Sequence, residues 1–427
     1  MKPHPSFGLV GAIADQTCRK CSPAFLIGLT VACAATTTDK SSLGSVPKSV
    51  DSAVARLDTA GLAHAPADLV NSLRLVREGD VGSAADVVDR DADPRDANAA
   101  LRSLIRASLL VGAQRWDRLA LLDERIDPAR LRGLAALRFA SPERYTFAED
   151  KSVLKLDATS IRTPLVEGFV GGRKLRFWID TGAGFTILNS EIAKALGIHP
   201  LAPPLQITTA TTATVPASPA ILPVLRVGSI TVENHPVLIV DSKELQVESF
   251  WGLARIFDIQ GMLGWNFIRN IDIEFNVRDQ RVVLRNPGDF RRSDRNLFWL
   301  GSPYFAARSE SGAEILFGID TGAAITYFTP RYTESVGVHL DAERQIVIQG
   351  VGGARQETIR TVKTTSFVLN GKKLYFADVV IRSPPWRRIV LADGILGADI
   401  LSSGVLRLNW PKGRITFQPY RSLRALD

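Results

Sequence analysis

The spacing of apolar positions changes near residue 150 and divides the chain into two kinds of structure. Between residues 49 and 148, apolar residues such as Leu69, Leu73 and Val76 recur three and four positions apart, which predicts amphipathic helices. Beyond residue 150, short runs alternate apolar and polar residues and are separated by glycine-containing turns, which predicts β-hairpins. We therefore expect a mainly β chain preceded by a small α-helical domain.

The helical segment contains a weak internal repeat. Leu75 and Val76 recur as Leu109 and Leu110, 34 positions later, and the apolar residues that follow recur at the same offset. A period of 34 residues is that of tetratricopeptide helical hairpins. Residues 49–148 therefore resemble a tetratricopeptide pair without its full signature. They are expected to form either a groove that binds a protein partner or a cap that packs on the next domain.

The first 33 residues carry the pattern of an export signal. Basic residues at positions 19 and 20 precede an apolar run of signal-peptide length, which ends at Cys33. A small, polar linker follows over residues 34–48. The arrangement resembles a bacterial lipoprotein signal, in which the cysteine carries the lipid, and ordinary cleavage near Cys33 is the alternative. We expect a periplasmic or outer-membrane protein of the bacterial cell envelope, attached to the membrane only through such a lipid.

Composition and charge remove several classes of function. Lys and Arg number 52 against 44 Asp and Glu, but the net charge of +8 is spread along the chain, so no nucleic-acid binding is predicted. All three cysteines precede residue 34, which excludes a disulfide framework or a cysteine-ligated zinc site in the body of the chain. We expect His199, His235 and His339 to be solvated, and Asp258, Asp272 and Asp393 to be surface acids.

The strongest signal is a motif that occurs twice. The sequence FWIDTGA at residues 177–183 returns as FGIDTGA at residues 317–323, 140 positions later. Downstream, GMLG at residues 261–264 is matched by GILG at residues 394–397, 133 positions later. Two copies with matched flanks indicate one structural unit used twice, with a polar connector between them.

An apolar strand that ends in Asp-Thr-Gly and is followed by two aliphatic residues and a glycine resembles the aspartic protease superfamily. The Asp-Thr-Gly-Ala form resembles retropepsins and their bacterial relatives. This resemblance implies two tandem acid-protease-type β-barrel lobes, at residues 150–288 and 300–421. It implies catalytic roles for Asp180 and Asp320. The residues implied to support the two active-site loops, by threonine hydrogen bonds between the loops and by tight glycine turns, are Thr181, Gly182, Thr321 and Gly322.

The resemblance also implies the chemistry. Two carboxyl groups that meet around one water share a proton, because both cannot ionise readily at close range. The ionised carboxyl takes a proton from the water while the protonated one donates to the scissile carbonyl. We therefore expect a monomeric endopeptidase that acts on proteins or peptides without a cofactor or metal. The alternative is a non-catalytic envelope protein that uses the same fold to bind peptides or serve as a scaffold.

Two details bear on pH and on substrate cover. Ala183 and Ala323 follow the Asp-Thr-Gly motifs and cannot donate a side-chain hydrogen bond to an ionised aspartate, so activity is expected at mildly acidic or neutral pH. Asn266 stands where the second lobe has Asp399. We expect this difference to affect how substrate is bound more than it affects the chemistry of the aspartates. The candidates for a mobile flap, or else for a plain surface turn, are Gly350, Gly352 and Gly353.

Overall fold

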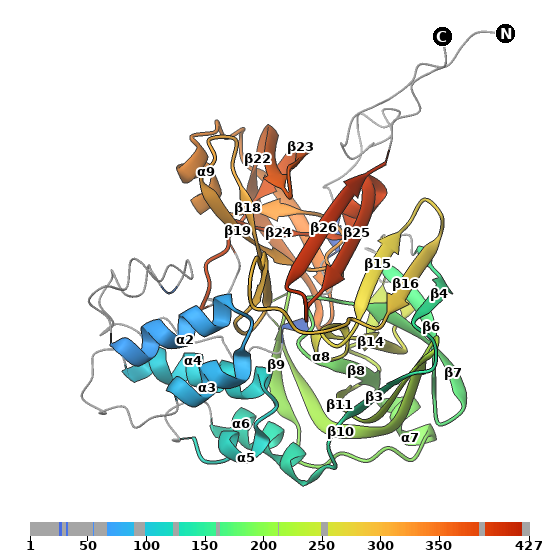
Figure 1. Cartoon of the computed structure of the whole chain (residues 1–427). Coiled ribbons are helices and arrows are strands. Elements are labelled where there is room, and N and C mark those ends of the chain that lie inside the picture. The colour runs from blue at the N-terminus through green and yellow to red at the C-terminus, as the bar shows by residue number, and fades with distance from the viewer. Residues whose placement is uncertain are drawn as a thin grey trace, which may run out of the picture.

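A computed structural model describes residues 66–88, 99–122, 128–158, 163–211, 213–248, 255–383 and 389–420, with short pieces at 25–27, 31–32 and 54. The described chain is mainly β, with a group of helices before two barrel-like sheets (Figure 1). The predicted fold class is confirmed. Cys33 and the predicted linker lie outside the described residues.

Helices fill most of the described chain between residues 66 and 139. Leu69, Leu73 and Val76 are fully buried, as the apolar spacing predicts. The guanidinium of Arg102 on the third helix forms two hydrogen bonds, of 2.6 and 2.8 Å, with the carboxylate of Asp68 on the first. The elements are α2 (Ala67–Arg77), α3 (Val81–Val88), α4 (Ala99–Gly112), α5 (Trp116–Leu119), α6 (Pro128–Ala135) and a 3-10 turn, η3 (Ala136–Phe139).

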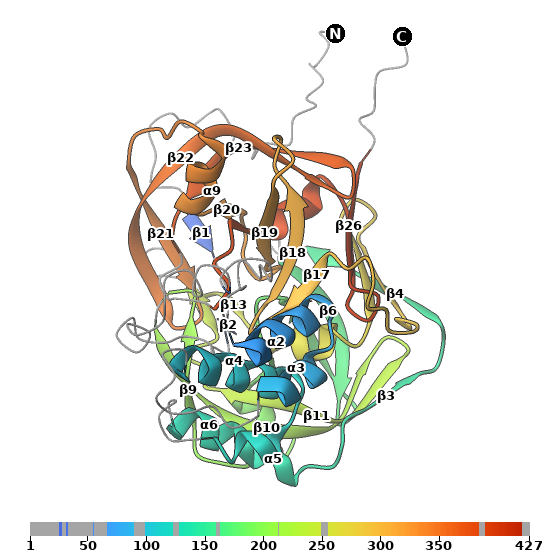
Figure 2. The ribbon, with the colours of Figure 1, turned by 60° about the vertical axis from the view of Figure 1, so that its left-hand side comes forward.

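The helices pack against both barrel-like sheets. Helix α2 contacts β17 (Leu297–Trp299), and α6 contacts β9 (Leu205–Thr209). The side chain of Arg77 lies 4.7 Å above the ring of Phe298 and forms a 2.7 Å ion pair with Glu314. Figure 2 shows the helices in front of the region where the two sheets meet. This packing favours the cap interpretation of the helical segment; the tetratricopeptide resemblance stays a prediction.

Among the described residues, the first sheet, which we call lobe 1, has ten strands. Its order is β2-β9-β10-β11-β8-β14-β7-β6-β5, with β3 added to β11, and a further pairing of β10 with β6 closes it. Two short helices, α7 (Ser190–Ala195) and α8 (Trp265–Ile268), follow β8 and β14. The other strands are β2 (Val31–Ala32), β3 (Arg144–Phe147), β5 (Asp157–Ala158), β6 (Pro164–Val170), β7 (Arg173–Ile179), β8 (Thr186–Asn189), β10 (Thr214–Val227), β11 (Ile230–Val240) and β14 (Gly261–Leu263).

The second sheet, lobe 2, has nine strands within the described chain and repeats this topology. Its order is β1-β21-β22-β23-β20-β24-β19-β18-β17, closed by a pairing of β22 with β18. Helix α9 (Pro330–Val336) follows β20, and the 3-10 turn η4 (Ala398–Ser402) follows β24. The other strands are β1 (Phe25–Ile27), β18 (Pro303–Arg308), β19 (Glu314–Ile319), β20 (Tyr327–Phe328), β21 (Arg344–Gly350), β22 (Gly353–Leu369), β23 (Lys372–Ile381) and β24 (Gly394–Leu396).

A third sheet joins the two lobes (Figure 1). Its order is β26-β25-β15-β16-β4, and β15 of the first half pairs directly with β25 of the second. Its strands are β4 (Lys151–Lys155), β15 (Asp272–Asn276), β16 (Arg281–Arg285), β25 (Gly404–Asn409) and β26 (Arg414–Pro419), and a separate hairpin is formed by β12 (Gln246–Glu248) and β13 (Arg255–Asp258).

Two acids that the sequence analysis expects on the surface are buried. Asp272 is 2% exposed and forms an ion pair with Arg407, with its nearest oxygen and nitrogen 2.5 Å apart, across the third sheet. Asp393 is 3% exposed and accepts hydrogen bonds from the Leu316 amide and the Arg331 guanidinium. Both expectations were wrong, because each acid has a long-range partner that a local pattern does not reveal. Asp258 lies in β13, and the structure does not describe its side chain.

The glycines of the downstream motif in lobe 1 lie in close contact with neighbouring groups. Strand β14 runs parallel to β7, and a Cβ on Gly261 would lie 2.5 Å from the ring of Phe177, which is fully buried. A Cβ on Gly264 would overlap the carbonyl of Phe185. Each motif glycine thus permits an approach that any side chain would block.

We expect Gly264→Ala to lower the free energy of unfolding by about 1–3 kcal/mol, the usual cost of overpacking against groups that cannot move. Gly82→Ala is the control, because Gly82 lies in α3 with no atom closer than 3.8 Å to its added Cβ. This control should change stability by less than about 1 kcal/mol. Chemical denaturation measures both, and equal stability of the two variants would contradict the packing argument.

Candidate active site

The two aspartates of the repeated motif occupy equivalent places at the ends of buried strands. Asp180 follows β7, and its amide donates to the carbonyl of Leu263 at 3.0 Å. Asp320 follows β19, and its amide donates to the carbonyl of Leu396 at 3.0 Å. Each aliphatic-glycine strand therefore fixes the residue at which its aspartate loop begins.

The structure brings the two aspartate loops together. A Cβ on Gly182 would lie 2.6 Å from the carboxyl group of Asp320, and a Cβ on Gly322 would lie 2.5 Å from that of Asp180. Each carboxyl group thus packs on the glycine of the opposite loop. Asp180 is fully buried and Asp320 is 4% exposed. The glycines are required here because any side chain would displace the opposing carboxyl group.

The threonines of the motif lock the loops to each other. The Thr181 amide donates to the hydroxyl of Thr321 at 3.1 Å, and the Thr321 amide donates to the hydroxyl of Thr181 at 2.9 Å. The Thr321 hydroxyl also donates to the carbonyl of Ile179 at 2.6 Å. The loop-supporting bonds that the family resemblance implies are therefore present. The two reciprocal bonds have the arrangement expected for an approximate two-fold axis between the loops.

The carboxyl groups interact directly. Oδ1 of Asp180 accepts from the amides of Gly182 at 2.8 Å and Ala183 at 3.1 Å, while its buried Oδ2 receives no hydrogen bond from an amide or hydroxyl of the described residues. Each carboxyl group packs on the glycine of the opposite loop, so the two groups face each other where the lobes meet. Two carboxyl groups held this close cannot both ionise readily.

Burial raises the pKa of Asp180, and the charge of Asp320 raises it further. The amides of Gly182 and Ala183 act in the opposite direction, because they stabilise the ionised form. The net result is a pKa well above the ordinary value of 3.8. One carboxyl group of the pair thus stays protonated at pH values where an exposed aspartate is ionised.

Asn266 and Asp399 occupy equivalent positions and brace the two loops differently. In lobe 1, Oδ1 of Asn266 accepts from the Thr186 amide at 2.8 Å and its Nδ2 donates to the carbonyl of Pro236. In lobe 2, the Asp399 carboxylate accepts from both the amide and the hydroxyl of Thr326, at 2.9 and 2.7 Å. Both side chains therefore brace the segment that follows each aspartate loop.

The flap candidates Gly350, Gly352 and Gly353 lie at a hairpin tip between β21 and β22. Gly352 has a φ of +82°. A Cβ added to Gly352 would lie 2.7 Å from the Cβ of Ala213, which belongs to the turn between β9 and β10 in lobe 1. The Thr211 hydroxyl donates to the carbonyl of Val351 at 3.2 Å. The tips of the two lobes therefore contact each other, so this hairpin is more than an isolated surface turn.

His235 is not solvated as the sequence analysis expects but fully buried. Its Nδ1 is hydrogen-bonded to Glu143, and its Nε2 lies 2.8 Å from the hydroxyl of Thr186. Sequence reasoning missed this pair because its members are 92 positions apart. The signal that was available is the position of His235 directly before the apolar run at residues 236–240.

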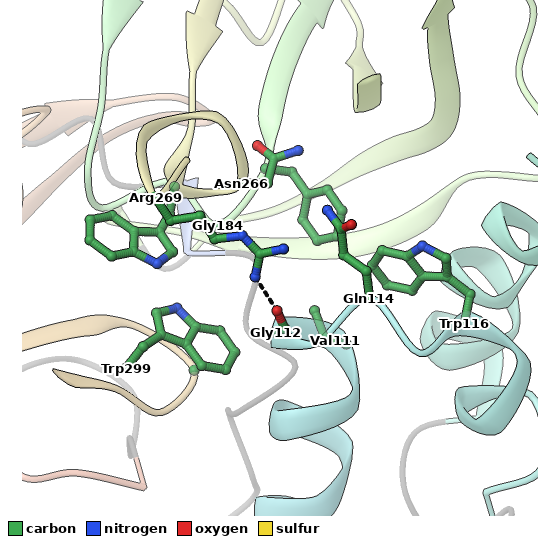
Figure 3. Close-up of a pocket in the computed structure, with 11 residues that line it drawn as sticks. Val111, Gly112, Gln114, Trp116, Gly184, Asn266, Arg269 and Trp299 are labelled. Atoms are coloured by element: carbon green, nitrogen blue, oxygen red, sulfur yellow. Dashed lines mark hydrogen bonds between the residues drawn. The ribbon is translucent and has the colours of Figure 1, made fainter. Parts of the chain in front are cut away.

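A pocket lies behind the Asp180 loop, where lobe 1, the helices and β17 of lobe 2 meet. Figure 3 shows the guanidinium of Arg269 crossing this pocket to donate to the carbonyl of Gly112, the last residue of α4. Aromatic side chains of Trp116, Trp265 and Trp299 line it. Among the described residues, no group of three or more His, Cys, Asp or Glu could hold a metal ion, and no helix is long and apolar enough to cross a membrane.

Comparison with known proteins agrees with this geometry. No curated protein matches the chain. Residues 166–267 and 307–400 match the family described as aspartyl protease, and each segment contains one aspartate loop and its aliphatic-glycine strand. The matched segments, together with the two barrel-like sheets, identify an aspartic protease fold.

Proposed function

We propose that the protein is an aspartic endopeptidase whose catalytic pair is Asp180 and Asp320. The observation that carries this proposal is that the two carboxyl groups face each other in a buried site, where burial and the charge of Asp320 raise the pKa of Asp180 and favour one shared proton. A shared proton supplies a general base and a general acid at the same place, as peptide hydrolysis through an activated water requires.

In the proposed reaction, the ionised carboxyl group takes a proton from a water molecule as the water oxygen attacks the scissile carbonyl carbon. The protonated carboxyl group donates to the carbonyl oxygen, so a neutral tetrahedral diol forms. Collapse of the diol breaks the carbon–nitrogen bond as the departing amine takes a proton from the pair and a diol hydroxyl returns one. The amides of Gly182 and Ala183 stabilise the ionised form of Asp180 during this exchange.

The contacting hairpin tips support a peptide or protein substrate. The outer strands of the two hairpins, β9 and β21, each pair with a short extended segment of the chain, β2 and β1 respectively. These pairings show that the outer edge of each hairpin can accept an extended segment by main-chain hydrogen bonds, as it would accept a peptide. The contact between the tips would have to open for a substrate to enter.

We also propose that the enzyme is monomeric and located in the bacterial cell envelope. Both aspartates belong to one chain, so a second copy is not needed to complete the pair. The basic and apolar pattern before Cys33 supports export and a lipid anchor.

Asp180→Asn and Asp320→Asn should each lower kcat by roughly 10²–10⁴-fold, because each removes one partner of the acid–base pair. Asp294→Asn is the control, since Asp294 is 81% exposed. Cleavage of a mixed peptide library, followed by mass spectrometry, measures all three. Full activity in either active-site variant would contradict the proposal, and peptide binding without cleavage by the wild-type protein would favour a binding module instead.

The raised pKa of Asp180 predicts a specific dependence of stability on pH. The native state holds a proton that the unfolded state loses above about pH 3.8, so the free energy of unfolding falls as pH rises from that value to the raised native pKa. Asp180→Asn removes this dependence. Its melting temperature relative to wild type should therefore be higher at pH 7 than at pH 3.5, and a difference that does not vary with pH would contradict the shared proton.

Gly352→Ala should raise KM roughly fivefold or more while kcat stays within about twofold, since the tip acts on substrate binding and not on the transition state alone. Gly371→Ala is the matched control. Gly371 has a similar φ of +74° in a hairpin turn, but no atom lies within 4 Å of its added Cβ. Steady-state kinetics with one cleaved peptide measures KM and kcat for both variants. An equal KM in Gly352→Ala and Gly371→Ala would exclude a role for the tip contact.

A further inference from the structure

The loops that carry the two aspartates are supported by different chemistry. In lobe 2, one carboxylate, Asp399, accepts both hydrogen bonds from Thr326. In lobe 1, the neutral Asn266 takes this place, and the hydroxyl of Thr186 also contacts His235. The strand registers align His235 with Ala377 of lobe 2, which has no polar side chain. The histidine is therefore an addition to lobe 1 alone.

The orientation of the Asn266 amide is fixed by partners that have only one role. Pro236 offers a carbonyl that can only accept, so Nδ2 of Asn266 faces it at 2.7 Å. The Thr186 amide can only donate, so Oδ1 of Asn266 faces it at 2.8 Å. Oδ1 is therefore also the acceptor for the Thr186 hydroxyl, 3.2 Å away.

The Thr186 hydroxyl has one proton and two neighbours that can take it. If Nε2 of His235 carries a hydrogen, it donates to Thr186 and the hydroxyl donates to Asn266. If Nε2 carries none, it competes for the hydroxyl proton and the bond to Asn266 is lost. The hydrogen on Nε2 thus decides whether Thr186 is held on Asn266.

Glu143 fixes the other nitrogen of the imidazole ring. Its side chain is 7% exposed and is hydrogen-bonded to Nδ1 of His235. Burial raises the pKa of Glu143, but His235, Gln114 and the charge of Arg269 outweigh burial and hold it below its ordinary value of 4.5. Burial and the charge of Glu143 raise the pKa of Tyr145, which donates to Glu143 as a neutral phenol.

Thr186 transmits this arrangement to the Asp180 loop. It is the first residue of β8, and its hydroxyl accepts from the Gly264 amide at 3.3 Å. The next two amides of the same segment, those of Trp265 and Asn266, donate to the carbonyls of Ala183 and Gly184 at 2.6 and 3.3 Å. A shift of Thr186 on Asn266 therefore moves the backbone that follows Asp180.

We propose that His235, paired with Glu143, is a positioning residue that fixes the Asp180 loop through the hydroxyl of Thr186. The proposal rests on the proposed endopeptidase function. It also links the helices to the active site, because Gln114 donates to Glu143 at 3.1 Å and Arg269 donates to Gly112 at the end of α4. The helical cap thus contributes to the environment of the catalytic pair without touching it.

Two variants test the pair without removing bulk. Glu143→Gln keeps the shape but replaces a carboxylate that can only accept with an amide that can also donate, so it no longer fixes the hydrogen bonds of His235 toward Thr186. His235→Gln removes the imidazole. Each should lower kcat by about ten- to a hundredfold, the range expected when reacting groups are slightly misplaced, with KM within about twofold. His199→Gln, at an exposed histidine, is the control and should behave as wild type.

A double-mutant cycle separates positioning from a general loss of stability. Thr186→Val removes the hydroxyl, and adding His235→Gln to it should cause no further loss of kcat, because both act at one point. Thr186→Ser should retain wild-type activity. When His235→Gln is instead combined with Thr326→Val in lobe 2, the two reductions in kcat should multiply, because the two substitutions act on different loops. The proposal would be overturned if the reductions in kcat multiplied in the double variant of Thr186→Val and His235→Gln. An unchanged kcat in His235→Gln alone would also overturn it.

Hydrogen exchange of the same variants distinguishes this proposal from the proposed function. Amides of residues 181–189 should exchange faster in His235→Gln than in wild type, while those of residues 321–329 should not change. If the wild-type protein cleaves no peptide, the proposed function fails, but the exchange result still decides whether His235 positions the loop. Equal exchange in both segments would reject the positioning role.

Discussion

The structure depends on holding two carboxyl groups in contact inside a protein. Taking one ionised carboxylate out of water is unfavourable, and two of them at hydrogen-bond distance repel each other strongly. The arrangement becomes stable when the pair carries one negative charge and one proton. Two backbone amides donate to each aspartate and stabilise whichever one is ionised, and the reciprocal threonine bonds prevent the loops from separating. The same constraint gives the pair both an acid and a base, which the proposed hydrolysis needs.

The two lobes meet this constraint in the same way near the aspartates and in different ways behind them. The threonine lock, the glycine contacts and the aliphatic-glycine strands obey the internal symmetry. The residues behind the loops do not obey this symmetry. Lobe 2 braces its loop with the carboxylate of Asp399, and lobe 1 uses Asn266, His235 and Glu143. Glu143 lies just before β3, the strand that leads from the helices into lobe 1. The asymmetry therefore arises where the helical cap joins the repeated unit.

Much of the fold could be predicted from the sequence because the signals are local or repeated. The apolar spacing around Leu69 and Leu73 predicts a buried helical face, and the duplicated Asp-Thr-Gly motif predicts two similar lobes. The roles of Thr181 and Thr321 followed from the family resemblance.

The contacts that sequence reasoning missed are long-range ones. The pairing of Asp272 with Arg407 spans 135 positions, and that of His235 with Glu143 spans 92. Neither is visible in periodicity or in a short motif, so a buried acid and a buried histidine were expected in solvent. The contact between the hairpin tips likewise joins residues 140 positions apart, Thr211 and Val351. Such pairs depend on how strands register in the closed lobes, and a single sequence does not contain that information.

The most direct test of the shared proton is a carboxyl ¹³C NMR titration of the protein labelled at aspartate, with Asp180→Asn and Asp320→Asn used to assign the two signals. The account predicts that the pair still binds one proton at pH values where exposed aspartates are ionised. If Asp180 and Asp320 both lose their protons near the ordinary value of 3.8, the buried pair does not share a proton and the central claim is wrong.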